Sequence, residues 1–122
     1  MTPEELAGLG RIKAEIEVFK GLKVVFHSLS VKEEEEVNVA VSQCPQDLMA
    51  RSAALQIETL CRAIESIGGK TFIDVKDLRK YIESLQRHVL SALWISWTSD
   101  FDSKSLKEID DLKKNSEERV PV

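Results

Sequence analysis

Apolar and charged residues alternate from Ile12 to Val18, and this period of two places the apolar side chains on one face of a strand. Lys20 and Gly21 suit a tight turn, and residues 22–29 are again rich in apolar and β-branched side chains. We therefore predict a β-hairpin over residues 12–29. A single helix that ends at Gly21 is the competing interpretation, because several apolar residues before it are also spaced by three or four.

The rest of the chain has the apolar spacing of helices, and each predicted helix begins at a residue that can cap it. The expected capping residues are Thr2, Ser30, Asp47, one of Asp74 and Asp77, and Ser105. Glutamate stands three residues after Thr2, Ser30 and Ser105, so these three starts have the pattern of a capping box. We predict that the first helix is short and that the second ends at Cys44-Pro45.

The helix predicted from Asp47 to about Ile67 is the most apolar of these segments, and we expect it to lie at the centre of the core. Gly68-Gly69 is interpreted as the signal that stops it. The next helix first presents an aliphatic face and then a heavier aromatic one. The first face holds Leu78, Ile82, Leu85 and Val89, and the second Leu90, Leu93, Trp94, Trp97 and Phe101.

The length and composition fit one globular domain. The chain has 122 residues, of which 43% are hydrophobic and 31% charged, and these values argue against disorder. We predict an α+β fold, mostly α, with a small N-terminal β-hairpin packed on a bundle of four to five helices. The last helix carries a narrow stripe at Leu106, Ile109 and Leu112. Residues 1–112 then form a single domain, and residues 113–122, which are polar and lack periodicity, form a flexible tail.

The charge balance disfavours two classes of partner. The formal net charge is −4 and the basic residues do not cluster, whereas nucleic acids and anionic membranes require a basic footprint. No run approaches the roughly 20 apolar residues that span a bilayer, and the acidic start from Met1 to Glu5 lacks an apolar signal region. We therefore expect a protein that acts in a cytoplasm.

Catalytic and metal-binding motifs are absent from the sequence. It has neither a glycine-rich phosphate loop nor the Cys and His spacing of a zinc site. His27 or His88 could join Cys44 or Cys61 as base and nucleophile, but nothing in the sequence brings such a pair together. We expect that the chain is not an enzyme and that it uses no cofactor or metal.

The most suggestive group of side chains is aromatic. Trp94, Trp97 and Phe101 follow one another at spacings of three and four, so they share one helix face, beside Leu90. Tryptophan is enriched among the residues that dominate the energy of protein interfaces. We predict that these four residues bind a partner protein, and an amphipathic helix has a suitable shape. The competing interpretation is that the group closes the core.

Two segments of the chain resemble tail assembly proteins of tailed bacteriophages. Lys23–Glu34 (KVVFHSLSVKEE) is similar to their opening signature, in which a hairpin strand ends in a pattern like V-x-F-R-x-L-T-V-K-E-E and a helix follows. Cys61–Gly69 (CRAIESIGG) is similar to a second element, which ends in I-x-S-I-x-G. His27 stands where the signature has arginine. This family is related to the small baseplate assembly proteins of contractile-tailed phages, and the resemblance extends to both.

The resemblance implies a tail assembly chaperone, a small, acidic, helical protein without catalytic residues. Such a protein coats the tape measure protein and helps to recruit tail tube subunits. It would act in the host cytoplasm during assembly. The alternative is a structural baseplate or tail subunit that stays in the virion. The sequence leaves the oligomeric state open, including a homo-oligomer.

Overall fold

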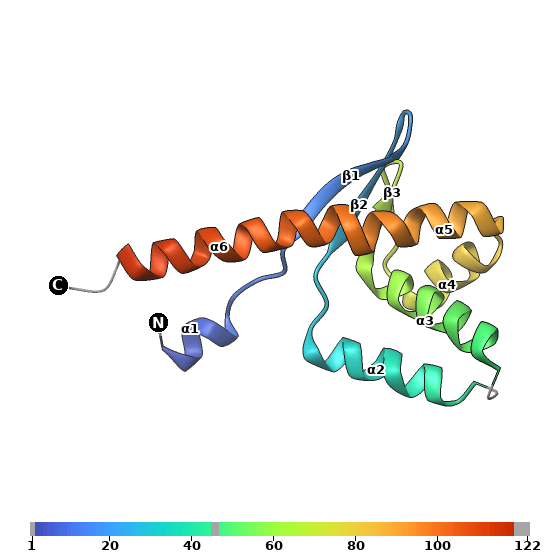
Figure 1. Ribbon diagram of the computed structural model, residues 1–122, viewed down its shortest axis with the longest axis horizontal. Helices are drawn as coiled ribbons and strands as arrows, with labels where there is room; N and C mark the ends of the chain where they lie inside the picture. Colours follow the sequence, from blue (N-terminus) through green and yellow to red (C-terminus); the bar gives the residue numbers. More distant parts are fainter. Residues whose placement is uncertain (1, 45–46, 119–122) are drawn as a thin grey trace.

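The computed structural model of the chain describes residues 2–44 and 47–118, and it has an α+β fold that is mostly α (Figure 1). The elements in chain order are α1 (Pro3–Ala7), β1 (Lys13–Phe19), β2 (Leu22–His27), α2 (Val31–Ser42), α3 (Leu48–Ala63), β3 (Ile64–Ile67), β4 (Lys70–Thr71), α4 (Val75–Glu83), α5 (Arg87–Ile95), the π-helix η1 (Ser96–Phe101) and α6 (Asp102–Glu118). The strands form one antiparallel sheet in the order β1-β2-β3-β4. The predicted fold class is confirmed, and the predicted hairpin is one half of this sheet.

The N-terminal hairpin forms as its alternating pattern predicts. Ile16 lies opposite Val24, and Phe26 pairs two positions further along β2, so these three buried side chains share the core face. Gly21 has a φ of 83°, in the left-handed region that favours glycine, and its N–H donates to Oε1 of Glu17 at 2.9 Å. The competing single helix ending at Gly21 is therefore wrong.

The helix predicted from Asp47 to Ile67 is too long at its C-terminal end. α3 ends at Ala63, and the next four residues form β3, in which Ile64 pairs with Phe26 of β2. Ile64 is buried there, so tertiary packing outweighs the local preference for helix. Gly68-Gly69 is accordingly the β3–β4 hairpin turn and not a helix stop. Its φ values of 56° and 85° are both positive, as a type I′ turn requires.

Four of the predicted helix caps form, at Thr2, Ser30, Asp47 and Asp74, whereas Ser105 lies inside α6 and caps no helix. Ser30 Oγ accepts the N–H of Glu33, and the Glu33 carboxylate accepts the N–H of Ser30, which completes the capping box of α2. Thr2, Asp47 and Asp74 each accept a backbone N–H at the start of α1, α3 and α4. Asp74, and not the later aspartate, therefore begins α4.

The long helix predicted after Asp74 is in fact two helices. α4 ends at Glu83, and the next residue, Ser84, turns its hydroxyl back to donate to the carbonyl of Tyr81 at 2.6 Å. The chain then makes a short turn, and α5 begins at Arg87. A side-chain hydroxyl that bonds the preceding turn competes with helix continuation, which is consistent with the break at this point.

The separate last helix predicted from Ser105 is also corrected by the structure. α5, η1 and α6 follow one another without a break from Arg87 to Glu118. Figure 1 shows this run as one long rod, of which the α6 part projects from the rest of the molecule. Helix thus continues past residue 112, and residues 119–122 of the predicted tail lie outside the described residues. The flexibility of the tail stays a prediction.

The core lies between the sheet and α3, α4, α5 and η1. Phe26 and Val24 of β2 are fully buried at its centre, where they meet Leu60 of α3. The other buried members are Ile16, Cys61, Ile64, Leu78, Ile82, Leu90, Leu93 and Phe101. α3 packs against α2, α4, α5 and β3, so it occupies the central position that its composition predicted.

A charged network ties α2, α3 and α4 together. Arg62 pairs with Glu36 of α2 at 3.3 Å and with Glu58, one turn earlier in α3, at 3.1 Å. Glu58 also accepts from Arg79 of α4, at 2.7 and 2.9 Å. Burial alone would raise the pKa of Glu58, but the hydrogen bonds and charges of the two arginines hold it below its ordinary value of 4.5. The ionised carboxylate of Glu58 therefore helps to hold α3 and α4 together.

Candidate functional site

The aromatic segment Ser96–Phe101 forms the π-helix η1 between α5 and α6. The rings of Trp97 and Phe101 stack, with centroids 4.8 Å apart and an interplanar angle of 12°. Phe26 of β2 lies 5.9 Å from Trp97 and 6.2 Å from Phe101. η1 therefore lies against the sheet, and π-helical turns of this kind often occur at functional sites.

The four residues predicted to bind a partner lie at different depths. Leu90 and Phe101 are buried, with exposed fractions of 7% and 4%. Trp94 and Trp97 are half-buried and pack against the core. The group thus contributes to the core, and the two tryptophans keep part of their surface outside it. A role of these residues in partner binding stays a prediction.

A groove of about 420 Å³ lies between η1, the start of α6 and the segment that leads from β2 into α2. One wall consists of Trp97, Thr98 and Phe101 of η1 with Asp102 and Ser105 of α6, and the other of Ser28, Leu29 and Glu34. Leu29 lies in the linker between β2 and α2. The capping box at Ser30 fixes the point at which this linker turns into α2, so the same motif that starts α2 also positions the second wall.

An apolar stripe on α6 continues the first wall of this groove. Leu106, Ile109 and Leu112 are 57%, 39% and 40% exposed. Two residues of the groove wall are spaced by four and by seven from residues of the stripe. Ser105 is followed at these spacings by Ile109 and Leu112, and Asp102 by Leu106 and Ile109. Residues at these spacings share a helix face, so the stripe and the groove lie on one side of the rod.

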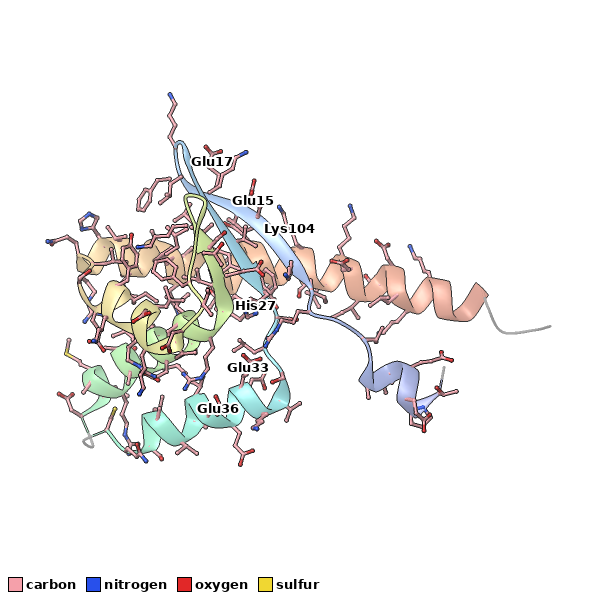
Figure 2. The ribbon with its side chains drawn as sticks, turned by 180° about the vertical axis from the view of Figure 1, so that it is seen from behind. Glu15, Glu17, His27, Glu33, Glu36 and Lys104 are labelled. Carbon is pink, nitrogen blue, oxygen red and sulfur yellow. The ribbon has the colours of Figure 1, made fainter. Side chains whose placement is uncertain are left out.

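We call this combined surface the apolar track. It consists of Leu29, Trp97, Phe101, Leu106, Ile109 and Leu112. Lys104 Nζ donates to the carbonyl of Glu15 at 3.2 Å, which ties the start of α6 to the edge of β1 (Figure 2). In the part of the chain that the structure describes, the extensive packing of α6 is with η1 alone. The stripe is therefore free to meet another molecule.

A second, more polar pocket of about 170 Å³ lies where β2, α2 and α3 meet. The guanidinium of Arg11 donates to the Glu33 carboxylate at 2.6 Å and to the carbonyl of Ser28 at 2.7 Å, and it lies 3.3 Å from Nδ1 of His27. Figure 2 labels His27, at the end of β2, and Glu33, in the first turn of α2. Burial alone would raise the pKa of Glu33, but hydrogen bonds from Arg11 and Ser30 hold it below 4.5.

His27 and Cys61 both line the polar pocket, a pairing for which the sequence has no signal. Burial raises the pKa of the Cys61 thiol to about 11, and the charge of Glu58 adds to the rise. A nucleophilic cysteine needs a lowered pKa, so this pair is not arranged for thiolate chemistry. His88 is exposed on α5, and Cys44 is half-buried beyond the end of α2.

Comparisons of the chain with models of protein families, with curated proteins and with solved structures found no match. Within residues 2–44 and 47–118, no three His, Cys, Asp or Glu side chains gather where they could hold a metal ion. The helices of the same ranges do not include one that is long and apolar enough to cross a bilayer. The geometry of the apolar track therefore carries the functional interpretation.

Sequence reasoning found both parts of the track but did not join them. The sequence predicts separate helices for the aromatic face and for the stripe at Leu106, because Ser105 followed by Glu108 has the pattern of a helix cap. The available signal was the constant spacing of four from Trp97 through Phe101 and Ser105 to Ile109. Leu29 lies about 70 residues earlier in the chain, and its place in the groove had no signal in the sequence.

Proposed function

We propose that this chain is a non-catalytic binding protein that holds a helical segment of another protein along the apolar track. The observation that supports this proposal is the continuity of the track, from the groove at Trp97 to the exposed end of the stripe at Leu112. These residues are separated by 15 positions, which corresponds to roughly 22 Å of helix. An amphipathic helix of similar length fits such a surface.

The energetics favour a reversible complex. Full burial of a leucine or isoleucine side chain contributes about 1.5–3 kcal/mol. Because the three stripe residues are about half exposed, covering all of them would contribute roughly 2–4 kcal/mol. This gain is smaller than the cost of association, so the groove at η1 must contribute as well. A partner held in this way is released easily, as a transient assembly factor requires.

We further propose that the partner is a phage tail protein, in the first place the tape measure protein. The resemblance of Lys23–Glu34 and Cys61–Gly69 to tail assembly proteins supports this identity. A chaperone for a long helical protein has to cover apolar stripes without performing chemistry, and an exposed apolar track suits that task. The alternative is a structural baseplate or tail subunit that remains in the virion.

Copurification with the tape measure protein of the same phage tests the proposal. The variant Ile109→Ser with Leu112→Ser should weaken binding about tenfold or more, because it removes two contacts of about 0.6–1.2 kcal/mol each. Leu48→Ser with Met49→Ser is the matched control, since these side chains are 82% and 78% exposed at the start of α3. Equal recovery of the tape measure protein by both variants would contradict the proposed surface.

Purified virions distinguish the two forms of the proposal. A chaperone leaves the particle, so mass spectrometry of mature virions should detect the chain at far below one copy per tail subunit. A stoichiometric amount in the particle would instead favour the structural subunit.

A further inference from the structure

The groove at η1 has an acidic side chain on each of its walls. Glu34 in the first turns of α2 and Asp102 at the start of α6 both line the groove, and both are exposed. Neither of them forms an ion pair within the described part of the chain. The described residues that line the groove include no basic side chain. A cationic group that enters the groove would therefore meet two carboxylates that are free to pair.

The stripe on α6 is acidic along both borders. Ile109 marks its centre, and the adjacent residues Glu108 and Asp110 lie about 100° to either side of it around the helix. Both carboxylates are exposed. Lys107 and Asp111, two positions from the centre, lie on the far side of α6. The residues that would flank a helix lying on the stripe are thus negatively charged on both sides.

A second copy of the chain is a poor occupant of this surface. The stripe is symmetrical about Ile109, so two antiparallel α6 helices related by a two-fold axis would match Leu106 with Leu112. The same axis would bring Glu108 beside Glu108 of the second copy on one border, and Asp110 beside its own equivalent on the other. Like charges would then meet on both borders, and such pairs are destabilising.

We propose that the occupant of the apolar track is an amphipathic helix whose apolar face is bordered on both sides by lysine or arginine. This proposal rests on the proposed function and adds the chemistry of the partner. Basic side chains would reach Glu34 and Asp102 at the groove, and Glu108 and Asp110 along α6. Exposed pairs of this kind add little affinity each, but they select the partner and speed association. Lys113 ends the stripe, so the basic border should stop before it.

Two designed helical peptides of about 18 residues test the proposal. Both carry the same leucine face, and its borders are lysine in one peptide and glutamate in the other. Fluorescence anisotropy with the full chain should show about tenfold tighter binding of the lysine-bordered peptide at low salt. The preference should shrink as the salt concentration rises, because exposed charges are screened.

Charge reversal on the chain itself sharpens the test. Glu108→Lys with Asp110→Lys should reverse the preference for the two peptides. Asp111→Lys with Glu83→Lys changes the net charge by the same amount, on the far side of α6 and on α4, and should leave the preference in place. A reversal in both double variants would mean that net charge decides the preference, and the acidic borders would then have no role.

The remaining outcomes separate this proposal from the proposed function. Equal affinity for the two peptides, or no binding of either, would overturn the proposal that the partner helix has basic residues along its borders. If the two peptides bind equally but both lose affinity in the Ile109→Ser, Leu112→Ser variant, the apolar track still binds helices and only the charge selection fails. A dimer in sedimentation velocity that the same variant abolishes would identify a second copy as the occupant and would overturn the proposal.

Discussion

Replacement of Phe101 by alanine tests how η1 is packed. Phe101 is 4% exposed, its ring stacks on Trp97 at 4.8 Å, and it lies 6.2 Å from the ring of Phe26. Truncation of a buried phenylalanine costs about 3–5 kcal/mol, of which the aromatic pairs contribute about 0.5–1.5 kcal/mol each. Because Trp97 is half-buried and can relax into the space, we expect the lower part of this range, about 3–4 kcal/mol.

A loss of this size is a large share of the stability of a small domain, which is typically about 5–15 kcal/mol. It corresponds to a fall in Tm of about 10–20 °C. Urea unfolding followed by tryptophan fluorescence and by circular dichroism measures it, and Trp97 reports directly on the site. Leu106→Ala is the matched control, because its side chain is 57% exposed, and it should change the free energy of unfolding by less than about 0.5 kcal/mol.

The refuting result is a change below about 1 kcal/mol in Phe101→Ala. Such a result would mean that the ring of Phe101 contributes no more than a surface side chain. The aromatic group would then be available to a partner as a whole, as the sequence first predicted. A large loss of stability would instead leave Trp94 and Trp97 as the members of the group that can touch a partner.

Two further predictions concern the charged network and the β3–β4 turn. Glu58→Gln should lower the free energy of unfolding by about 1–3 kcal/mol at neutral pH, because Arg62 and Arg79 lose their carboxylate. The pKa of Glu58 in the folded protein lies below 4.5, so the extra stability of the wild type over Glu58→Gln should be lost as the pH falls through that pKa. Urea titrations at a series of pH values should show the difference in the free energy of unfolding disappear. Gly69→Ala should cost about 1–2 kcal/mol in thermal melts, because its φ is 85°, whereas Gly10→Ala should be nearly neutral.

Local signals predicted the N-terminal half of the fold well. The hairpin over residues 12–29 and the capping box at Ser30 depend on residues that are neighbours in the sequence. β3 could not be predicted in this way, because Ile57, Leu60, Ile64 and Ile67 keep the spacing of the preceding helix. Pairing with β2, about 40 residues earlier, decides that the last part of this segment is extended.

The sequence predicts which residues of the candidate site share a helix face, but it does not predict which parts of that face are exposed. Spacing places Trp97 and Phe101 on one side of a helix, yet it does not show which element covers them. The structure supplies that cover, since Phe26 of β2 lies against both rings. The π-helix itself has no sequence signal that we can identify. It joins α5 to α6 without a break, so the helix boundary predicted at Ser105 does not exist.

The apolar track also shows how one helix face can serve both folding and binding. Along the face that carries the track, the exposed fraction of the side chains rises toward the C-terminus. Phe101 is buried, Ser105 is half-buried, and Leu106, Ile109 and Leu112 are exposed. The change occurs where Lys104 meets β1, which is the outermost strand of the sheet that the described residues form, so this sheet does not continue over α6. Substitutions of the buried residues before this point should therefore affect stability, and substitutions of the exposed stripe residues after it should affect partner binding. Phe101→Ala should act mainly on unfolding and Ile109→Ser mainly on copurification, and the opposite assignment would contradict this division.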